Sequence, residues 1–352
     1  MKQPMINGID PSIQKDQTHL KVGVLLSGDG SYLKGTKSFL LPFQEQIQSM
    51  GGTFFLFSLK DWAGKKVNGT YFHPKKNTWV QESFSFPTII YNRLSRRKEE
   101  KSFRFYKLKE WAEDNKTVLF NSRFLSKDTL YTKLNQHPQL RSHLPPFLVK
   151  PTLSKLNDVL DDWNSLYIKP ISSSQGKGIL KVLERQNAEY IVHSNKGMTA
   201  LSKEQITAHL STSIIQKTVE SDRIEGRPYD LRVLAHFNGN SFAITGTGVR
   251  VAGPNKITTH IPCGGRLLPF SSIQGRIPLS SLQNLVETCG VWLNQTEYER
   301  YYELSFDIGV TKEGKLALYE INSKPMTFDE KWIEEKRMES LIRLCTYYCN
   351  QR

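Results

Sequence analysis

The sequence predicts an α/β domain at the N-terminus followed by a longer α+β region. The first part opens at Leu20 with LKVGVLLSGDG, an apolar strand that ends in a glycine-rich turn, and continues with a helix over 38–50 and a second strand over 53–58. This order is the pattern of a β-α-β unit. The second part is rich in short strands joined by small-residue loops. At 352 residues, the chain should form two or three lobes with substantial cores.

The composition is that of a folded, basic protein. Its 48 Lys and Arg residues exceed its 34 Asp and Glu residues, which gives a formal net charge of +14. This charge favours an anionic partner such as ATP, an acidic peptide, a cell-wall polymer or nucleic acid. No apolar run approaches the roughly eighteen residues of a membrane helix, and the polar start has no signal-peptide core, so we expect a cytosolic protein. Cys263, Cys289, Cys345 and Cys349 show no CxxC spacing, which predicts free thiols.

The N-terminal α/β domain is expected over residues 20–125, behind a flexible polar tail of residues 1–19. A strand over 88–92 continues the alternating pattern, and a short strand over 118–121 ends the domain. Gly28-Asp29-Gly30 lacks the third glycine of a dinucleotide site, so we interpret it as a turn.

The stretch 93–111 (RLSRRKEEKSFRFYKLKEW) combines basic and aromatic residues, a pattern that is also typical of nucleic-acid binding. Its acids Glu99, Glu100 and Glu110 dilute the positive field, which favours a solvated helix face. Nucleic-acid binding is therefore an alternative that we consider weaker.

Three elements precede the segments that carry chemistry. The pattern predicts a helix over 126–140 with Ser126 as its N-cap, a strand over 147–150 after Pro145-Pro146, and a helix over 156–163. The next strand, 167–170, delivers Lys169 and leads into the small-residue loop 172–178.

This loop, SSSQGKG, is suited to a triphosphate. Serine and glycine expose backbone N–H groups to phosphate oxygens, and Lys169 and Lys177 add positive charge. The residues of the loop that we assign to this role are Ser173, Ser174, Gly176, Lys177 and Gly178. The alternative is an ordinary hairpin tip.

Segment 213–220 (SIIQKTVE) is an apolar strand that runs into a polar stop. Its backbone could meet an adenine edge, with Glu220 on the ribose hydroxyls; the alternative is a buried strand. Farther along, Arg232 and Arg250 lie on two strands and present the fixed fork of donors that matches carboxylate and phosphate groups. In the following loop, 258–265, His260 is interpreted as structural.

The hairpin over 303–325 holds three oxygen-bearing side chains. Glu320 and Asn322 are two residues apart and so share a sheet face, and Asp307 on the partner strand can join them. Two carboxylates and an amide oxygen suit Mg²⁺, although acids of an ordinary hairpin would simply face solvent. A helix over 282–292 precedes this hairpin, and a docking helix over 329–349 follows it.

In this order the segments resemble the ATP-grasp superfamily. The segments that carry the resemblance are Lys127, IKP with Lys169, SSSQGKG, IIQKTVE, RPYDLRV, TGVRVAG, CGG, SFDIGV and YEINSKP. The N-terminal segments VGVLLSGDG, FFLFSLKDW and PTIIYNRL are similar to the endospore-coat-associated YheC/YheD branch. The resemblance thus covers nearly the whole chain.

The resemblance implies an N-terminal pre-ATP-grasp domain and a two-lobed ATP-grasp domain over 126–352, with the smaller lobe at about 145–218. Two α+β lobes would clamp ATP between them. Lys127 and Lys169 would bind its phosphates, with Lys133 as a rival for Lys127.

The remaining contacts are implied in the same way. Gln216 to Val219, including Lys217, would line the adenine, and Glu220 would meet the ribose, with Asp222 and Glu225 as alternatives. Arg232 and Arg250 would neutralise the transferred phosphoryl group. Asp307, Glu320 and Asn322 would hold one or two Mg²⁺ ions.

The implied reaction joins a carboxylate to an amine or similar nucleophile through an acyl phosphate. The acceptor is open; it could be a small carboxylate, an acidic peptide or a polymer. A second hypothesis is a spore-coat assembly protein that binds ATP without turnover, and a third is a nucleic-acid binder that uses 93–109.

Overall fold

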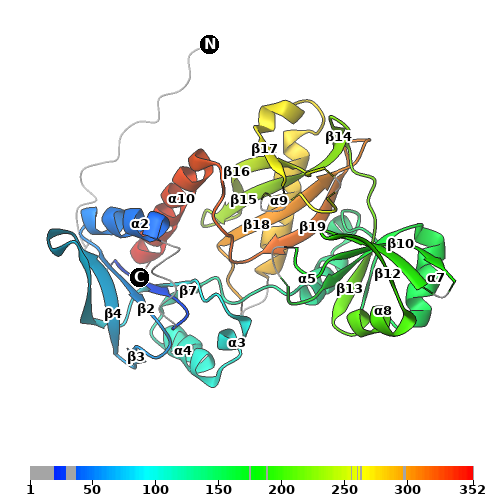
Figure 1. Cartoon of the computed structure of the whole chain (residues 1–352). Coiled ribbons are helices and arrows are strands. Elements are labelled where there is room, and N and C mark those ends of the chain that lie inside the picture. Colours follow the sequence, from blue (N-terminus) through cyan, green and yellow to red (C-terminus); the bar gives the residue numbers. More distant parts are fainter. Residues whose placement is uncertain are drawn as a thin grey trace, which may run out of the picture. The chain divides into compact units, whose positions relative to one another are not determined.

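The computed structural model describes residues 20–28, 37–173, 176–187, 189–254, 256–259, 261, 264–295 and 299–351. The chain divides into two compact units. The first comprises the residues up to Phe120 and those from Leu341 onward, and the second runs from Asn121 to Ser340. Figure 1 shows the elements of both units.

The first unit is built on one sheet with the strand order β3-β4-β2-β1-β6-β7. Its parallel strands are β1 (Lys21–Leu25), β2 (Thr53–Phe57), β6 (Ile89–Asn92) and β7 (Val118–Phe120). With α2 (Lys37–Ser49) between β1 and β2, they confirm the predicted β-α-β opening. An antiparallel extension that we did not predict is formed by β3 (Trp62–Ala63), β4 (Lys66–His73) and β5 (Thr78–Ser85).

Helices α2 and α4 (Phe103–Asp114) cover opposite faces of this sheet. On α2, Phe43 packs edge-on against Phe54 and Tyr91. On α4, Phe105 joins the core that contains Phe55, the next residue of β2. Because neighbouring strand residues point to opposite faces, these contacts place the helices on either side. Short elements, α3 (Arg97–Glu100) and a 3-10 helix η3 (Pro74–Lys76), complete the unit.

The second unit contains two antiparallel lobes. The smaller lobe has the strand order β12-β11-β10-β9-β13-β8. Its strands are β8 (Phe147–Val149), β9 (Leu166–Pro170), β10 (Leu180–Gln186), β11 (Glu189–Ser194), β12 (Gly197–Leu201) and β13 (Ser213–Lys217). Helices α7 (Leu153–Trp163) and α8 (Lys203–Leu210) share a core with Ile168 and Ile215. Their neighbours Lys169 and Gln216 therefore point to the opposite face.

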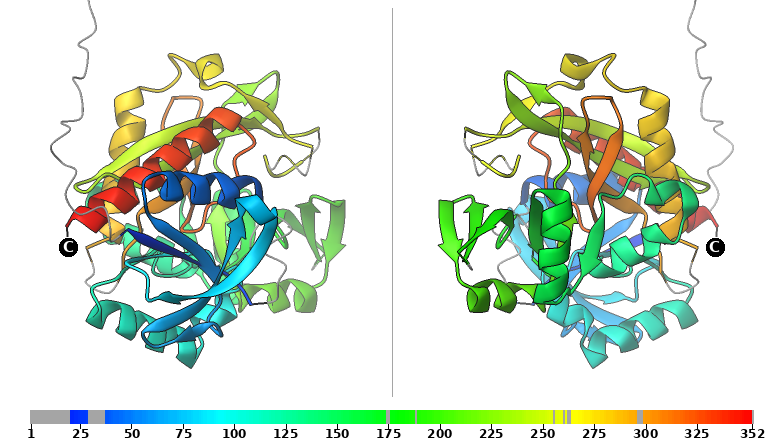
Figure 2. Two further views of the ribbon diagram at one scale, coloured as in Figure 1. Left: turned by 90° about the vertical axis from the view of Figure 1, so that its left-hand side faces the viewer. Right: turned by 90° about the vertical axis from the view of Figure 1, so that its right-hand side faces the viewer.

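The larger lobe has the strand order β17-β16-β15-β18-β19, with β14 on β15. Its strands are β14 (Arg223–Ile224), β15 (Arg227–Phe237), β16 (Phe242–Val251), β17 (Arg266–Leu268), β18 (Glu303–Val310) and β19 (Leu316–Asn322). One sheet face packs on α5 (Lys127–Asn135), α6 (Pro138–Arg141) and α9 (Leu279–Leu293) in the largest core. Figure 2 shows α9, in gold, alongside these strands. The 3-10 helix η5 (Phe270–Ile273) and α10 (Lys331–Asn350) complete the elements.

One helix prediction was wrong in extent. The single helix expected over 126–140 is two helices, α5 and α6, with His137 between them as the N-cap of α6. Pro138 begins α6, where its missing N–H is harmless, and the His137 ring accepts from the backbone N–H of Leu140. Ser126 is the N-cap residue of α5, but its side chain makes no capping bond and binds the Asp128 carboxylate instead.

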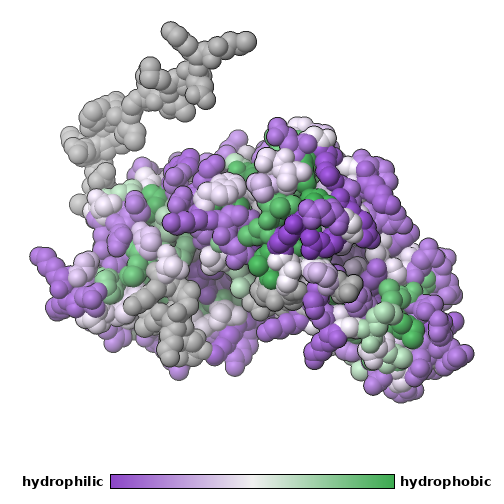
Figure 3. Space-filling view, turned by 45° about the horizontal axis from the view of Figure 1, so that its top comes forward, coloured by the Kyte–Doolittle hydropathy of each residue, from purple (hydrophilic) through white to green (hydrophobic). Residues whose placement is uncertain are grey.

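The cysteine prediction holds where the structure describes these residues. Cys289 and Cys345 are buried free thiols, and Cys349 is a half-buried one; Cys263 lies outside the described residues. Among the described residues, no helix is both long and apolar enough to cross a membrane. The face drawn in Figure 3 is largely hydrophilic, with smaller green groups of apolar residues.

Candidate functional site

The charged side chains of the larger lobe gather on the sheet face that α5, α6 and α9 leave uncovered. On β15, Leu231 and Val233 enter the core, so Asp230 and Arg232 point the other way. The register places Arg232 opposite Asp307 and Asp230 opposite Arg250. Pairing between neighbouring strands thus brings both predicted arginines to the same face as a predicted metal ligand.

A β-bulge completes this face on β19. The pairs Ile308–Leu318 and Asp307–Glu320 leave Tyr319 as the extra residue. The bulge shifts the alternation: Leu318 and Ile321 both enter the core, and Tyr319 and Glu320 both line the opposite side. A side chain at Gly309 would collide with the Tyr319 hydroxyl, so the ring depends on a glycine there. Its hydroxyl oxygen lies 3.0 Å from Ser221 Oγ.

These groups face a cavity of about 140 Å³ that residues of both lobes line. Eight of the residues singled out from the sequence line it: Lys127, Lys169, Gln216, Lys217, Val219, Arg250, Asp307 and Glu320. Sequence reasoning missed Tyr167, Tyr319, Asp230 and Thr259, which also line it. The alternation of Asp230 with Arg232 in RPYDLRV could have indicated Asp230, whereas nothing local indicated Tyr319.

Other predicted residues lie apart from the cavity lining. Arg232 donates to the carbonyl of Met326 (3.3 Å) and stacks 4.4 Å from the centre of the Phe328 ring. The side chain of Glu220 is 88% exposed, 4.0 Å from Lys312 Nζ. Asn322 pairs with Ser305 in the sheet.

The small-residue loop meets the site through its backbone. The carbonyl of Ser173 accepts from Lys127 Nζ (3.0 Å). Gly176 and Gly178 have positive φ angles of 67° and 73°, which only glycine adopts readily. Lys177 is exposed, and Ser174 lies outside the described residues.

Lys127 is buried and Lys169 is half-buried, and their amino groups have different partners. Lys127 Nζ lies 3.0 Å from Glu320 Oε1. Lys169 Nζ donates to Gln216 Oε1 and lies 5.7 and 5.4 Å from the ring centres of Tyr167 and Tyr319. Burial lowers the pKa of Lys169 to about 8, an effect that Lys127 reinforces and that Glu320 and Asp307 oppose.

Arg250 is held by two carboxylates. It forms a bidentate pair with Asp230 (2.9 and 2.7 Å) and lies 3.0 Å from Asp307 Oδ1. Thr259 Oγ1 donates to Asp230 as well (2.6 Å). Burial acts to lower the pKa of Arg250, but the two carboxylates outweigh it and raise that pKa. The guanidinium is therefore a fixed positive charge in a fixed orientation.

Asp307 and Glu320 face each other across β18 and β19, and Asn322 is two residues beyond Glu320 on the same side of its strand. This set offers only oxygen ligands, which fits Mg²⁺ and leaves positions for water and phosphate. Among the described residues, no group of three or more His, Cys, Asp and Glu side chains is arranged to hold a metal ion. A cation here would use the amide of Asn322 as well as the two carboxylates.

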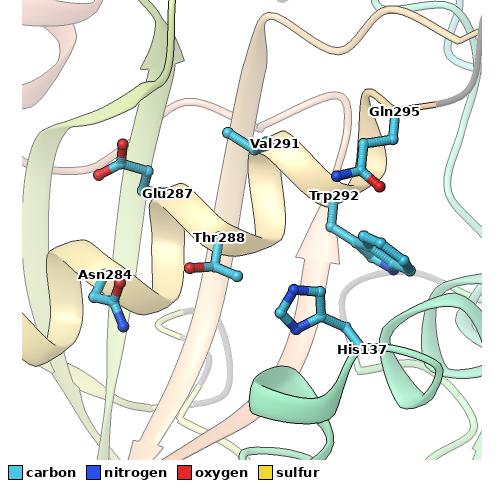
Figure 4. Close-up of a pocket in the computed structure, with 7 residues that line it drawn as sticks. All are labelled: His137, Asn284, Glu287, Thr288, Val291, Trp292 and Gln295. Atoms are coloured by element: carbon cyan, nitrogen blue, oxygen red, sulfur yellow. The ribbon is translucent and has the colours of Figure 1, made fainter.

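A second hollow of about 340 Å³ lies on α9 and the start of α6. Figure 4 shows His137 facing Trp292, whereas Glu287 and Val291 project away from His137. The indole N–H of Trp292 already donates to the carbonyl of Lys133 (2.9 Å). The side chains that line this second hollow do not converge as those of the first cavity do, so we assign no chemistry to the hollow.

Comparison with known proteins gives the family model and the relatives that the chain matches. The family model described as YheC/D like ATP-grasp matches residues 116–351. The endospore coat-associated protein YheD of Bacillus subtilis (strain 168) is 25% identical over 310 residues, which cover 82% of this chain and 67% of that protein.

Two solved structures share the fold. D-alanyl-alanine synthetase A from Vibrio cholerae is 14% identical with a TM-score of 0.57, and the match covers 95% of this chain and 100% of that one. The ATP-grasp ligase PsnB, solved with precursor peptide PsnA2 and AMPPNP, is 11% identical with a TM-score of 0.52, over 92% of this chain and 98% of that one. At these identities the likeness is one of fold.

Proposed function

The chain belongs to the YheC/D-like ATP-grasp family, and we propose that it is an ATP- and Mg²⁺-dependent ligase that joins a carboxylate to an amine or similar nucleophile. One observation carries the proposal. Lys127 and Lys169 face one cavity together with Asp307 and Glu320, so cations for phosphate and carboxylates for a metal ion meet at one place.

The nucleotide contacts follow from the cavity lining. Lys127 and Lys169 bind phosphates, together with the backbone of the Ser173–Gly178 loop. Lys133 is the weaker choice for the Lys127 role, because it pairs with Glu299 (3.4 Å) and is absent from the described lining of the cavity. Val219, two residues beyond the end of β13, offers its backbone to the adenine edge, beside Gln216 and Lys217.

Glu220 is the acid that we assign to the ribose. The two alternatives are already engaged: Asp222 pairs with Arg276 (2.6 Å) and accepts from the Tyr229 hydroxyl (3.0 Å), and Glu225 pairs with Arg266 (2.6 Å). Among the described residues, the ionic neighbour of Glu220 is Lys312, whose Nζ lies 4.0 Å from the Glu220 carboxylate. Its exposed carboxylate is therefore the one with most freedom to turn toward a ligand.

The mechanism follows from charge. An acceptor carboxylate that attacks the γ-phosphate is repelled by it, so Arg250 in the cavity, with Arg232 opposite Asp307 on the same sheet face, neutralises the transferred group while an acyl phosphate and ADP form. The nucleophile then attacks the acyl carbon and phosphate leaves. Mg²⁺ held by Asp307, Glu320 and Asn322 would supply further neutralisation of the triphosphate. Because Asp230 holds Arg250 in a bidentate pair, this arginine needs no rearrangement as the charge develops.

The acceptor that we propose is an acidic peptide or polymer. Two observations support this class: the net charge of +14, which favours anionic partners, and the precursor peptide bound to PsnB, a protein of the same fold. The name of the Bacillus subtilis relative supports a role in the spore coat, with the cytoplasm as the place of reaction.

A specific observation also favours the second candidate, an ATP-binding coat protein without turnover. Lys127 already neutralises Glu320, and Arg250 already neutralises Asp307. Because a cation of the chain already lies beside each carboxylate, neither carboxylate needs a metal ion to compensate its charge, whereas phosphoryl transfer does need one.

ADP release in the presence of Mg²⁺ and acidic peptides tests both candidates. The ligase predicts acceptor-dependent ADP and phosphate, and Glu320→Gln should lower that rate by about a hundredfold or more. Nucleotide binding without turnover for any acceptor would support the coat protein. A Glu320→Gln variant with the turnover of the parent would refute the metal assignment.

A further inference from the structure

The hydroxyl of Tyr131 is a buried group for which the proposed reaction has no direct use. Tyr131 lies on α5 with about 1% of its surface exposed. Its oxygen is 3.0 Å from the carbonyl of Leu318 and 3.0 Å from that of Tyr319. Because a carbonyl only accepts, the single hydroxyl proton must point at these two groups. Toward any further partner, the hydroxyl can act only as an acceptor.

That further partner is the side-chain amide of Gln216. Since the Tyr131 oxygen must accept, Gln216 has to present its NH₂ group there, and its carbonyl oxygen then faces the other way, toward Lys169. An ammonium group has three donors and no acceptor, so the lysine requires that same orientation. Tyr131 and Lys169 thus hold the Gln216 amide in the same orientation.

We propose that Tyr131 is a positioning residue for Lys169: it orients the Gln216 amide so that the lysine keeps one acceptor behind it and directs its other two N–H bonds into the cavity. The same hydroxyl is anchored to the backbone at Leu318 and Tyr319, directly before Glu320. The Tyr131 hydroxyl therefore links Gln216, the partner of Lys169 in the smaller lobe, to strand β19 of the larger lobe, which carries Glu320. This inference rests on the proposed role of Lys169 in phosphate binding.

The substitution Tyr131→Phe removes this control without removing the ring. Without the hydroxyl, Lys169 alone holds the amide, and because the terminal torsion of a glutamine is broad and roughly two-fold, the carbonyl oxygen can turn away from the ammonium. The other charged groups that act on Lys169 stay in place: Lys127 on α5, Asp307 on β18 and Glu320 on β19. We expect the affinity for Mg-ADP, measured by titration calorimetry, to fall about tenfold.

The double variant Tyr131→Phe/Gln216→Glu separates positioning from a purely structural role. Both oxygens of a carboxylate accept, so Glu at 216 offers Lys169 an acceptor in either orientation and needs no hydroxyl to hold it. We expect the double variant to regain most of the lost affinity. If Tyr131 mattered only for packing, a buried carboxylate beside Phe would make binding worse, and that result would overturn the inference.

The matched control is Tyr190→Phe. Tyr190 is also buried, on β11, and its hydroxyl donates to Asn157 (2.7 Å) away from the cavity lining. This variant should be destabilised to a similar extent in denaturant unfolding and should bind Mg-ADP like the parent. Equal loss of affinity in Tyr131→Phe and Tyr190→Phe would count against positioning.

A second readout needs no nucleotide. Acylation of Lys169 in the free protein, followed by mass spectrometry against the exposed Lys155, reports how well its ammonium is held. We expect the rate to rise severalfold in Tyr131→Phe and to return in the double variant; an unchanged rate would overturn the inference. If the parent protein binds no Mg-ADP, the proposed function fails, and the acylation rates still decide the role of Tyr131.

Discussion

The two walls of the cavity hold their cations in different ways. In the larger lobe, Arg250 is clamped between Asp230 and Asp307, so its charge is permanent and its position is fixed. In the smaller lobe, Lys169 rests on a neutral amide and between two tyrosine rings, and burial lowers its pKa to about 8. The larger lobe therefore presents an arginine held by two ion pairs, and the smaller lobe presents a lysine whose protonated form a bound anion would stabilise.

The difference between Arg250 and Lys169 comes from the groups that contact each cation. A carboxylate balances the charge of a buried cation, whereas an amide oxygen and aromatic faces stabilise that charge without balancing it. We expect substitutions in the larger lobe to act mainly on stability, and substitutions in the smaller lobe to act mainly on nucleotide binding.

The largest expected effect comes from Asp230→Ala. The change leaves Arg250 buried with one carboxylate fewer, and breaking a buried ion pair costs about 3–5 kcal/mol. Urea unfolding should show this loss. Asp158→Ala removes an exposed partner of Lys155 (3.4 Å) and should change stability by less than about 1 kcal/mol. Equal losses in the two variants would erase the contrast between the clamped arginine and a surface pair.

Gly309→Ala should have the next largest effect. The added methyl group meets the Tyr319 ring at the bulge, and overpacking of this kind costs about 1–3 kcal/mol. Thermal unfolding measures the cost. In Gly309→Ala/Tyr319→Leu, where the ring is gone, the penalty of the alanine should shrink; a penalty that persists in full would place its cause elsewhere.

The pH dependence of binding tests the smaller lobe. Phosphate binds the charged form of Lys169, and in the free protein that form is lost as the pH rises through about 8. Affinity for Mg-ADP should be flat below neutral pH and then decline by up to about tenfold per pH unit above 8. Lys169→Arg is the control, because arginine stays protonated in this range. The decline should therefore be absent in that variant, and a decline of the same size in both would assign the titration to another group.

Lys177→Met should have the smallest effect. Lys177 is exposed in the loop, where water screens its charge, so its loss should weaken nucleotide binding by only about two- to fivefold. The difference from the parent should vanish at high salt. Calorimetry at two salt concentrations measures both values, and a loss that persists in high salt would indicate that the loop closes over the ligand.

Much of the arrangement follows from short-range rules. The alternation of side chains along the hairpin over 303–325 was enough to predict that Glu320 and Asn322 share a face that Asp307 can join, and the sheet register pairs Asp307 with Glu320. The parallel opening of the first unit and the hairpin near the C-terminus were predicted in the same way. The β4–β5 hairpin was missed, because its exposed strands mix polar, aromatic and small residues without a clear period.

The sequence alone determined the order of most elements along the chain, the shared face of Glu320 and Asn322 and the likeness to ATP-grasp proteins, because these depend on residues close together in the chain. Only the tertiary structure decided that Asp230 clamps Arg250, that Tyr319 enters the cavity and that Tyr131 reaches Gln216. Each of these depends on a partner far away in the sequence: the bulge at Tyr319 needs a glycine on the neighbouring strand, and the orientation of one amide is set by a hydroxyl 85 residues away.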